Sequence, residues 1–281
     1  DLNDVMYEHI RRNVFHKNNF KDSIIGTVKD INKITEDTLY TCYNTFYHPS
    51  NMFLVVCGDF DKEEILNIIM DNQNKKVFKE YKEIKVKKYK EPDTVVKKEE
   101  VIDINTEIPK VSYNFKIKNN TDLSTRLFNL YLFVIFSILF DDTSEFDFSA
   151  KEENIISNTL YLNLLNCDSH ILISLINETN KFKALINKIN ETLNNIDISE
   201  DDLERKKKVL MSNELFSFEN IEVVNDMIVD NIIFENKIEE NLISLINSLN
   251  IEQLEIVLDS LNLKNTSIVV LKPKEIEKSK K

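Results

Sequence analysis

The stretch that decides the fold is residues 23–61, SIIGTVKDINKITEDTLYTCYNTFYHPSNMFLVVCGDFD. It contains the two glycines of the 281-residue chain, Gly26 and Gly58. A soluble domain averages about 7% glycine, so this chain makes nearly all its turns without it. We therefore expect Gly26 and Gly58 where the backbone needs a positive φ or a close approach that a Cβ would block.

Between the two glycines the sequence predicts a capped helix followed by a strand. Thr35 is placed to cap a helix over 36–47, with acidic residues in its first turn. Pro49 ends that helix. The apolar run NMFLVVCG (51–58) that follows is predicted to be a buried strand.

Composition indicates a folded soluble protein. Hydrophobic residues make up 42% of the chain and charged residues 30%, which argues against disorder. The formal net charge is −12 and arginine is scarce. Phosphate binding depends on clustered basic charge, so we expect no nucleic-acid partner.

The cysteines and the apolar runs predict a cytoplasmic protein without a membrane partner. Cys42, Cys57 and Cys167 are odd in number and far apart, and are interpreted as buried free thiols in a reducing compartment. No signal peptide opens the chain. The longest apolar run, 127–140, is too short to span a bilayer and is predicted to be a buried helix.

Sequence patterns place further elements along the chain. Apolar spacing predicts helices over 2–17, from Asp61, near 150–165, over 178–194 and after a Ser199 cap. Alternation predicts strands in EVIDIN (100–105), KVSYNFKI (110–117), DSHILISLIN (168–177) and TSIVVLKPK (266–274). Lysines crowd 75–98, which is interpreted as a solvated linker; a basic targeting patch is the alternative.

An internal repeat relates the two ends of the chain. Residues 31–59 align without gaps on 246–274, an offset of 246 − 31 = 215 residues. Both copies run from a capped helix through a short turn to a strand. The same offset predicts that the first copy lacks about a hundred residues before Asp1, so that the chain starts in mid-domain.

The ordered features of 23–61 resemble the pitrilysin/insulinase-type metallopeptidases, also called inverzincins. They are Gly26-Thr27, the helix start from Ile34 to Leu39, FYHPSNM (46–52) and Val56 to Asp61. The resemblance is strong over 20–62 and weaker, in the same order, to the end. The second half resembles the family's second repeat, and the chain is identified as a bacterial two-repeat member.

The resemblance implies an α+β fold with duplicated sheet-plus-helices domains of the LuxS/processing-peptidase-like type, the first copy incomplete at its N-terminus. Residues 1–85 would be the C-terminal part of the first metallopeptidase-like domain. Residues 86–98 would be a Lys-rich linker, and 99–281 the second, non-catalytic domain. The domains of this family close around unfolded peptide and add it as a strand to a sheet edge.

Family members that cleave peptides bind zinc through an H-x-x-E-H helix and a later glutamate. No such motif occurs here, so we assign no catalytic, cofactor-binding or metal residues to this chain. The segment from Val5 to His9 only mimics the motif, and Glu8 and His9 are expected on a helix surface. The family's ligands would precede Asp1, and zinc is expected in a full-length active member.

The second repeat offers no substitute for the zinc motif. Phe133, Phe136 and Ser137 stand where His, Glu and His would be, so this helix is interpreted as core. Many active members also use an Arg–Tyr pair late in the second domain to hold substrate. Residues 206–281 contain neither residue type, which argues against peptidase activity.

The remaining polar clusters are interpreted as structural. A calcium site in the acidic loop formed by Asp141, Asp142, Glu145 and Asp147 is disfavoured because the spacing does not fit, so a solvated loop is expected. Asp59 and Asp61 flank the end of the predicted strand and are interpreted as structural, and His170 as a packed or edge histidine.

Three functions remain open. The chain is a fragment of a zinc-dependent endopeptidase-like protein that acts on peptides or unfolded protein. Alternatively, it is a non-catalytic homologue that pairs with an active peptidase subunit, as a homo- or heterodimer, and contributes to substrate binding. The third possibility is a stand-alone binding scaffold.

Overall fold

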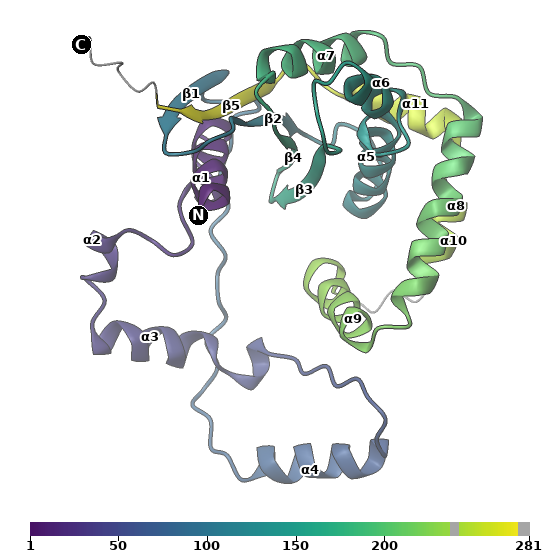
Figure 1. Cartoon of the computed structure of the whole chain (residues 1–281). Helices are drawn as coiled ribbons and strands as arrows, with labels where there is room; N and C mark the ends of the chain where they lie inside the picture. Colours follow the sequence, from purple (N-terminus) through teal and green to yellow (C-terminus); the bar gives the residue numbers. More distant parts are fainter. Residues whose placement is uncertain (237–241, 275–281) are drawn as a thin grey trace. The chain divides into compact units, whose positions relative to one another are not determined.

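The computed structural model describes residues 1–236 and 242–274 (Figure 1). Within them, the contacts define two compact units. Unit 1 comprises residues 1–25, 89–209 and 245–274, and unit 2 comprises residues 26–88, 210–236 and 242–244. The predicted first repeat, 1–85, is thus shared between both units. A repeat and a compact unit are different divisions, so the predicted repeat boundaries stay a prediction.

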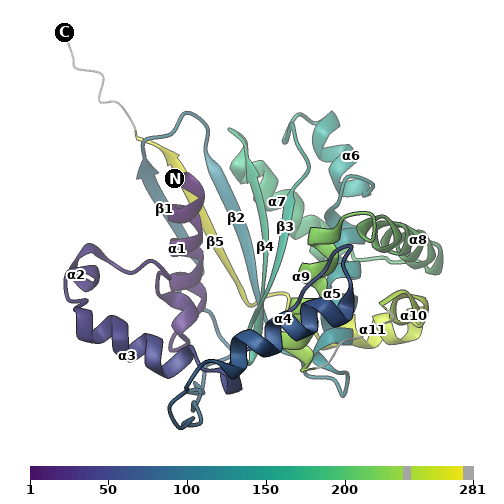
Figure 2. The same ribbon diagram turned by 90° about the horizontal axis from the view of Figure 1, so that it is seen from below.

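Unit 1 is built on a five-stranded mixed sheet in the order β1-β5-β2-β4-β3 (Figure 2). β1 runs parallel to β5, and the other neighbours are antiparallel. The strands are β1 (Glu99–Ile104), β2 (Lys110–Ile117), β3 (Tyr161–Cys167), β4 (His170–Glu178) and β5 (Thr266–Pro273). Four of them, β1, β2, β4 and β5, confirm the strands that were predicted from the alternation of apolar and polar residues.

Helices cover both faces of this sheet. On one face, α7 contacts β2 and α5 contacts β3, while α6 and α11 pack against these helices. Because side chains alternate along a strand, Phe115 meets Phe136 of α5 with ring centroids 5.0 Å apart, while Lys116 faces the opposite side. The bounds are α5 (Thr125–Phe140), α6 (Glu145–Glu152), α7 (Phe182–Asn194) and α11 (Ile251–Ser260).

The opposite face is covered by α1 (Leu2–Val14), which begins at an Asp1 cap. Met6, Ile10 and Val14 recur every four residues, so they share one helix face. They are fully buried against side chains of β4 and β5. Burying each such side chain contributes roughly 1.5–3 kcal/mol. The N-terminal helix therefore belongs to the core of unit 1, and a short 3-10 turn (Asn19–Lys21) follows it.

The predicted buried helix within 127–140 is confirmed by α5. Residues 125–152, which contain α5 and α6, are long and apolar enough to be considered as a membrane span. However, α5 itself ends at Phe140, and ten of its side chains are buried in unit 1. This burial is what the core helix of a folded domain shows.

Unit 2 consists of helices and extended chain. Its elements are α2 (Val28–Ile31), α3 (Glu36–Phe46), a 3-10 turn (Pro49–Asn51), α4 (Lys62–Asn74) and α9 (Ile221–Glu235). The Thr35 cap of α3 is confirmed, with a capping box to Thr38. None of the described side chains of unit 2 that can be classed for burial is buried. Two helices, α8 (Glu200–Ser217) and α10 (Leu242–Asn247), span the boundaries between units.

The predicted buried strand at 51–58 is wrong. In the structure Asn51 ends the 3-10 turn, residues 52–57 have no strand pairing, and Leu54 is 68% exposed. A strand needs hydrogen-bonding neighbours, and within the described residues none pairs with this segment. The apolar pattern alone does not supply them.

The predicted helix near 150–165 is also wrong in part. α6 ends at Glu152, and residues 161–167 form β3. The sequence YLNLLNC is rich in leucine, which favours a helix. Pairing with β4 through a two-residue turn at Asp168, where φ is +60°, overrides that preference.

Both glycines meet the expectation drawn from their scarcity. Gly26 has a φ of +69°, a region that side chains disfavour. A Cβ on Gly58 would lie 3.3 Å from the ring of Phe60. The cysteine expectation holds for Cys167, which is buried, but Cys42 is exposed and Cys57 half-buried because both lie in unit 2.

Candidate functional site

The candidate site is a groove beside β3, the edge strand of the sheet in unit 1. Within the described residues β3 pairs with β4 along one side and has no partner strand along the other. The groove measures about 480 Å³. Its walls come from α1, the start of β2, the turn before β3, and the ends of β3 and β4: Asn3, Tyr7, Lys110, Asn158, Thr159, Tyr161, Ile176, Asn177 and Glu178.

Two tyrosines line the groove. Tyr7 comes from α1, and Tyr161 opens β3 with 60% of its surface exposed. Burial raises the pKa of Tyr7, and the neighbouring Tyr161 raises it further. The Tyr7 phenol is therefore neutral near pH 7, and the rings of Tyr7 and Tyr161 offer flat surfaces to a ligand.

One polar atom in the groove lacks a partner. The Asn177 side chain is 7% exposed, and its Nδ2 donates to the carbonyl of Asn158 at 2.8 Å. Its Oδ1 accepts no hydrogen bond. A buried acceptor without a donor is costly, so this oxygen is suited to receive an N–H group from a ligand. Lys110, in contrast, is already held by Asn3 and Glu178.

The helix at the position of the zinc motif is part of the core. Phe136 of α5 is 1% exposed and packs between Phe115, which it meets edge-on, and Phe140. Ser137 is 4% exposed, and Phe133 is partly exposed. Neither phenyl ring offers a ligand atom for a metal. Across the described residues, no three His, Cys, Asp or Glu side chains gather in a metal-binding geometry.

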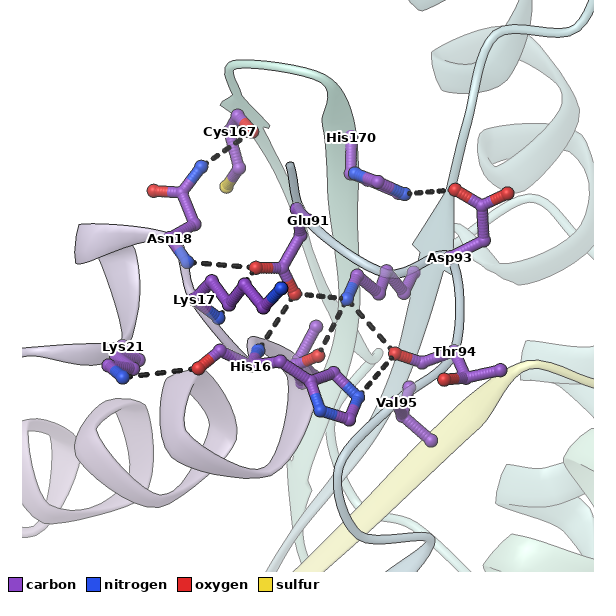
Figure 3. Close-up of polar contacts among 12 residues, drawn as sticks. His16, Lys17, Asn18, Lys21, Glu91, Asp93, Thr94, Val95, Cys167 and His170 are labelled. Atoms are coloured by element: carbon purple, nitrogen blue, oxygen red, sulfur yellow. Dashed lines mark hydrogen bonds and ion pairs between the residues drawn. The ribbon is translucent and has the colours of Figure 1, made fainter. Parts of the chain in front are cut away.

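A buried ion pair joins α1 to the sheet. Lys116 and Glu91 meet at 2.6 Å with both side chains fully buried. Glu91 also accepts backbone N–H groups from the three residues that follow α1: His16 at 2.7 Å, Lys17 at 2.7 Å and Asn18 at 2.8 Å (Figure 3).

The lysine is equally satisfied. Its Nζ donates to Glu91 and to the carbonyls of Val14 and Thr94, both at 3.0 Å. A lysine has three N–H donors, so none is left for a ligand. We define this cluster of Glu91, Lys116 and the backbone of residues 14–18 as the ionic junction, and its role is structural.

Burial by itself would raise the pKa of the Glu91 carboxyl. The Lys116 hydrogen bond and the three backbone donors outweigh burial and lower the pKa from 4.5 to about 2. Glu91 is therefore ionised at neutral pH. Glu100 of β1 behaves likewise: bonds from Lys97, His9 and Asn13 outweigh burial and hold its pKa at about 2.

The ionic junction corrects the interpretation of 86–98 as a solvated linker. From Tyr89 onward the segment belongs to unit 1, and Glu91 is buried. Sequence analysis missed Glu91 among the lysines. No sequence signal was available, because Lys116 alternates with apolar residues in β2 and is therefore expected on the solvent-facing side of the strand.

The structure also places the other predicted residues. Glu8 pairs with Arg12 on α1, whereas His9 is half-buried and bonds Glu100 at 2.8 Å, so it is not a free surface residue. His170 is packed as predicted, with its Nε2 3.0 Å from Asp93. Burial lowers its pKa against the opposing effect of Asp93.

The acidic loop is less solvated than predicted. Asp141 pairs with Lys206 of α8, and Asp147 is buried on α6, where its Oδ2 contacts Lys151 at 2.6 Å. Asp142 and Glu145 are exposed, as expected for a solvated loop. In unit 2, Asp61 caps α4, which confirms its structural role, and Asp59 is exposed.

The fold defines a class: an α+β sheet-and-helix domain in which α5, the helix at the position of the zinc motif, is part of the core. Residues 33–210, more than half of the chain, match the family model described as the peptidase M16 inactive domain. The chain therefore belongs to the peptidase M16 family, the pitrilysin-type family that its sequence resembles.

Individual relatives agree. One relative is a Bacillus subtilis (strain 168) protein described as the uncharacterized zinc protease YmfH. The two sequences are 35% identical over 164 residues, and this alignment covers 52% of this chain and 38% of the relative. A solved structure described as a putative M16-like peptidase from Alicyclobacillus acidocaldarius shares the fold, with a TM-score of 0.88 at 24% sequence identity. The structural match covers 95% of this chain and 65% of that one.

A protease from Helicobacter pylori also shares the fold. Its TM-score is 0.81 at 16% identity, and the match covers 96% of this chain and 66% of that one. The chain thus spans less than two thirds of the length of each of these relatives.

Proposed function

We propose that this chain is a non-catalytic part of a peptidase-type protein and that it holds extended peptide along β3. The observation that carries this proposal is the unpaired edge of β3 with the groove beside it. An extended peptide adds to such an edge through main-chain hydrogen bonds, while side pockets take alternate side chains. The groove supplies the Asn177 oxygen as an acceptor and the rings of Tyr7 and Tyr161 as apolar walls.

The environment of α5 supports a role in which this chain binds peptide without cleaving it. Phe136 and Ser137 are packed in the core at the positions of two motif residues. Rebuilding a metal site there would require displacing the aromatic cluster around Phe136. The family match to an inactive domain agrees with this role.

For the whole protein, a zinc endopeptidase and a non-catalytic homologue paired with an active subunit both keep this role for residues 1–281. They differ in whether the polypeptide that contains these residues also contains an H-x-x-E-H helix. A stand-alone scaffold would need neither an H-x-x-E-H helix nor an active partner subunit. We also place the protein in the cytoplasm, because Cys42, Cys57 and Cys167 are unpaired thiols.

The test measures binding of fluorescein-labelled β-casein, an unfolded protein, by anisotropy in the presence of EDTA. Tyr161→Lys places a charge in the groove and should weaken binding at least fivefold. Phe148→Lys is the matched control, since Phe148 is 65% exposed on α6 and Tyr161 is 60% exposed. The control should change binding less than twofold. Equal effects of the two variants, or binding that requires zinc, would sink the proposal.

A further inference from the structure

One side of α1 faces the edge strand β3. α1 lies over β5 and β2, so the sheet continues past the helix to β4 and β3 (Figure 2). Asn3, Tyr7 and Arg11 are spaced four residues apart and therefore share one side of α1. The opposite side carries His9, which bonds Glu100 of β1 at the far end of the sheet. The side with Tyr7 and Arg11 consequently points towards β3.

The surface of β3 on the α1 side of the sheet is open. Residues that pair directly across two antiparallel strands share one side of the sheet. Tyr161 and Leu165 pair with Ile176 and Leu172 of β4, which pack against the buried residues of α1. Yet Tyr161 is 60% exposed and Leu165 36% exposed. Exposed side chains therefore continue along β3 from the groove towards Cys167.

Arg11 is a cation without a partner next to this open part of β3. Its Nε is buried and donates to no acceptor. Among the described residues no ion pair includes its guanidinium, whereas the neighbouring Arg12 pairs with Glu8 at 2.6 Å. Arg11 lies close enough to Cys167 for its charge to oppose the rise in the pKa of that thiol on burial. A buried N–H group without an acceptor is costly, and a carboxylate accepts two parallel bonds from a guanidinium.

The groove offers an acceptor at some distance from this cation. The Nδ2 of Asn177 donates to the carbonyls of Asn158 at 2.8 Å and Thr159 at 3.4 Å, so the unpartnered atom of the amide is the oxygen. Arg11 lies one helix turn beyond Tyr7, the groove residue of α1, and a turn rises about 5.4 Å. Alternate residues of an extended peptide are about 6.6 Å apart. The acceptor and the cation are therefore spaced to meet different residues of one extended peptide.

The charge of the whole chain makes a local cation informative. The formal net charge is −12, so the overall field repels an acidic peptide. Within the groove, Lys110 is already paired with Glu178 at 3.1 Å. A preference for a carboxylate would therefore report a nearby unpaired cation, and Arg11 is such a cation.

We propose that the groove beside β3 selects peptides that carry a carboxylate, and that Arg11 binds this carboxylate. A main-chain N–H group of the same peptide donates to the Asn177 oxygen, so the carboxylate lies towards the Cys167 end of β3. This proposal rests on the proposed binding of peptide along β3 and adds the substrate class. The carboxylate is either the C-terminus of the peptide or an acidic side chain, and both present the same pair of oxygens.

The test measures peptide binding to chain 1–281 by fluorescence anisotropy in the presence of EDTA. Two pairs of fluorescein-labelled, eight-residue peptides of alternating valine and serine are compared. The first pair ends in a carboxylate or in an amide. The second pair is amidated and carries glutamate or glutamine at its sixth position. At least one peptide with a carboxylate should bind at least fivefold more tightly than its neutral twin, and the pair that shows the difference identifies the source of the carboxylate.

Two neighbouring arginines supply the variant and its matched control. Arg11→Gln should remove the preference for the carboxylate and change the binding of the neutral peptides less than twofold. Arg12→Gln removes a cation that is exposed and already paired, so the preference should remain. Equal binding of the charged and neutral peptides, a preference that survives Arg11→Gln, or its equal loss in Arg12→Gln would overturn the proposal.

The neutral peptides separate this proposal from the one on which it rests. If Tyr161→Lys leaves their binding unchanged, the peptide does not lie along β3 and both proposals fail. If Tyr161→Lys weakens their binding but Arg11→Gln leaves the preference for the carboxylate intact, only the role of Arg11 is wrong.

Discussion

Units 1 and 2 contain corresponding pieces of one repeat, yet they differ in what their apolar side chains contact. In unit 1 the capped helix α11 and strand β5 lie in a core where Leu254, Val257 and Val270 are fully buried. In unit 2 the equivalent helix α3 and segment 52–57 bury none of their side chains. The repeat pattern is the same, and the difference lies in the neighbouring strands.

The comparison shows how little a local pattern does by itself. The start of α3 at the Thr35 cap was predicted from the sequence and is found in the structure, because a cap needs only nearby residues. A buried strand needs partners from distant parts of the chain. Unit 1 has those partners and is expected to unfold cooperatively, whereas unit 2 alone is expected to open at little cost in free energy.

The largest effect should come from placing a charge on the buried face of α1 in chain 1–281. Ile10→Asp buries a carboxylate in the core of unit 1, where Ile10 is fully buried. It should lower the free energy of unfolding by more than about 4 kcal/mol, measured by urea denaturation followed by circular dichroism.

Ile228→Asp on α9 is the matched variant. Ile228 is only half-buried, so the free energy of unfolding of chain 1–281 should change by less than about 0.5 kcal/mol. A loss comparable to that of Ile10→Asp would mean that unit 2 is as tightly packed as unit 1.

The ionic junction gives the next largest effect. Glu91→Gln leaves the buried Lys116 charge unpaired and should cost about 3–5 kcal/mol of unfolding free energy. Arg12→Gln, which removes an exposed pair with Glu8, should cost only about 0.3–0.5 kcal/mol. Adding Lys116→Met to Glu91→Gln should restore part of the loss. An unchanged urea midpoint in Glu91→Gln would show that the junction does not anchor α1.

Acid should weaken unit 1 through the same carboxylates. Glu91 and Glu100 have pKa values lowered to about 2 in the folded protein, against an ordinary value of 4.5. A depressed folded pKa stabilises the protein above the unfolded pKa, and the stabilisation is lost as pH falls. The melting temperature should therefore drop between about pH 4.5 and pH 2. Glu91→Gln should show a smaller drop, and an identical pH profile would argue against this cause.

Sequence reasoning predicted the elements whose signals are local. The helices α1, α3, α5 and α7 and strands β1, β2, β4 and β5 followed from periodicity and caps. β3 was missed, because its leucines favour a helix and its strand form depends on pairing with β4. The strand at 51–58 was predicted from its apolar run, but no neighbour is available within the described residues.

The site was less accessible to sequence reasoning than the fold. That Phe133, Phe136 and Ser137 replace the zinc motif could be read directly from the sequence, and the structure adds that Phe136 is packed in the core. The groove beside β3 combines Tyr7 and Tyr161 from distant parts of the chain, so no spacing in the sequence announces it. Glu91 was hidden among lysines, and its partner Lys116 lies on the polar side of the alternating sequence of β2, so neither residue indicates a buried pair.

The three native cysteines test the contrast between the units most directly. Burial raises the pKa of the Cys167 thiol in unit 1 to about 12, which keeps it unreactive. Cys42 is exposed and Cys57 half-buried in unit 2. Labelling of native chain 1–281 with a thiol reagent at pH 8, with sites located by mass spectrometry, should modify Cys42 and Cys57 within minutes. Cys167 should react only as the protein unfolds. Rapid labelling of Cys167, or protection of both Cys42 and Cys57, would contradict the contrast between a packed unit 1 and an open unit 2.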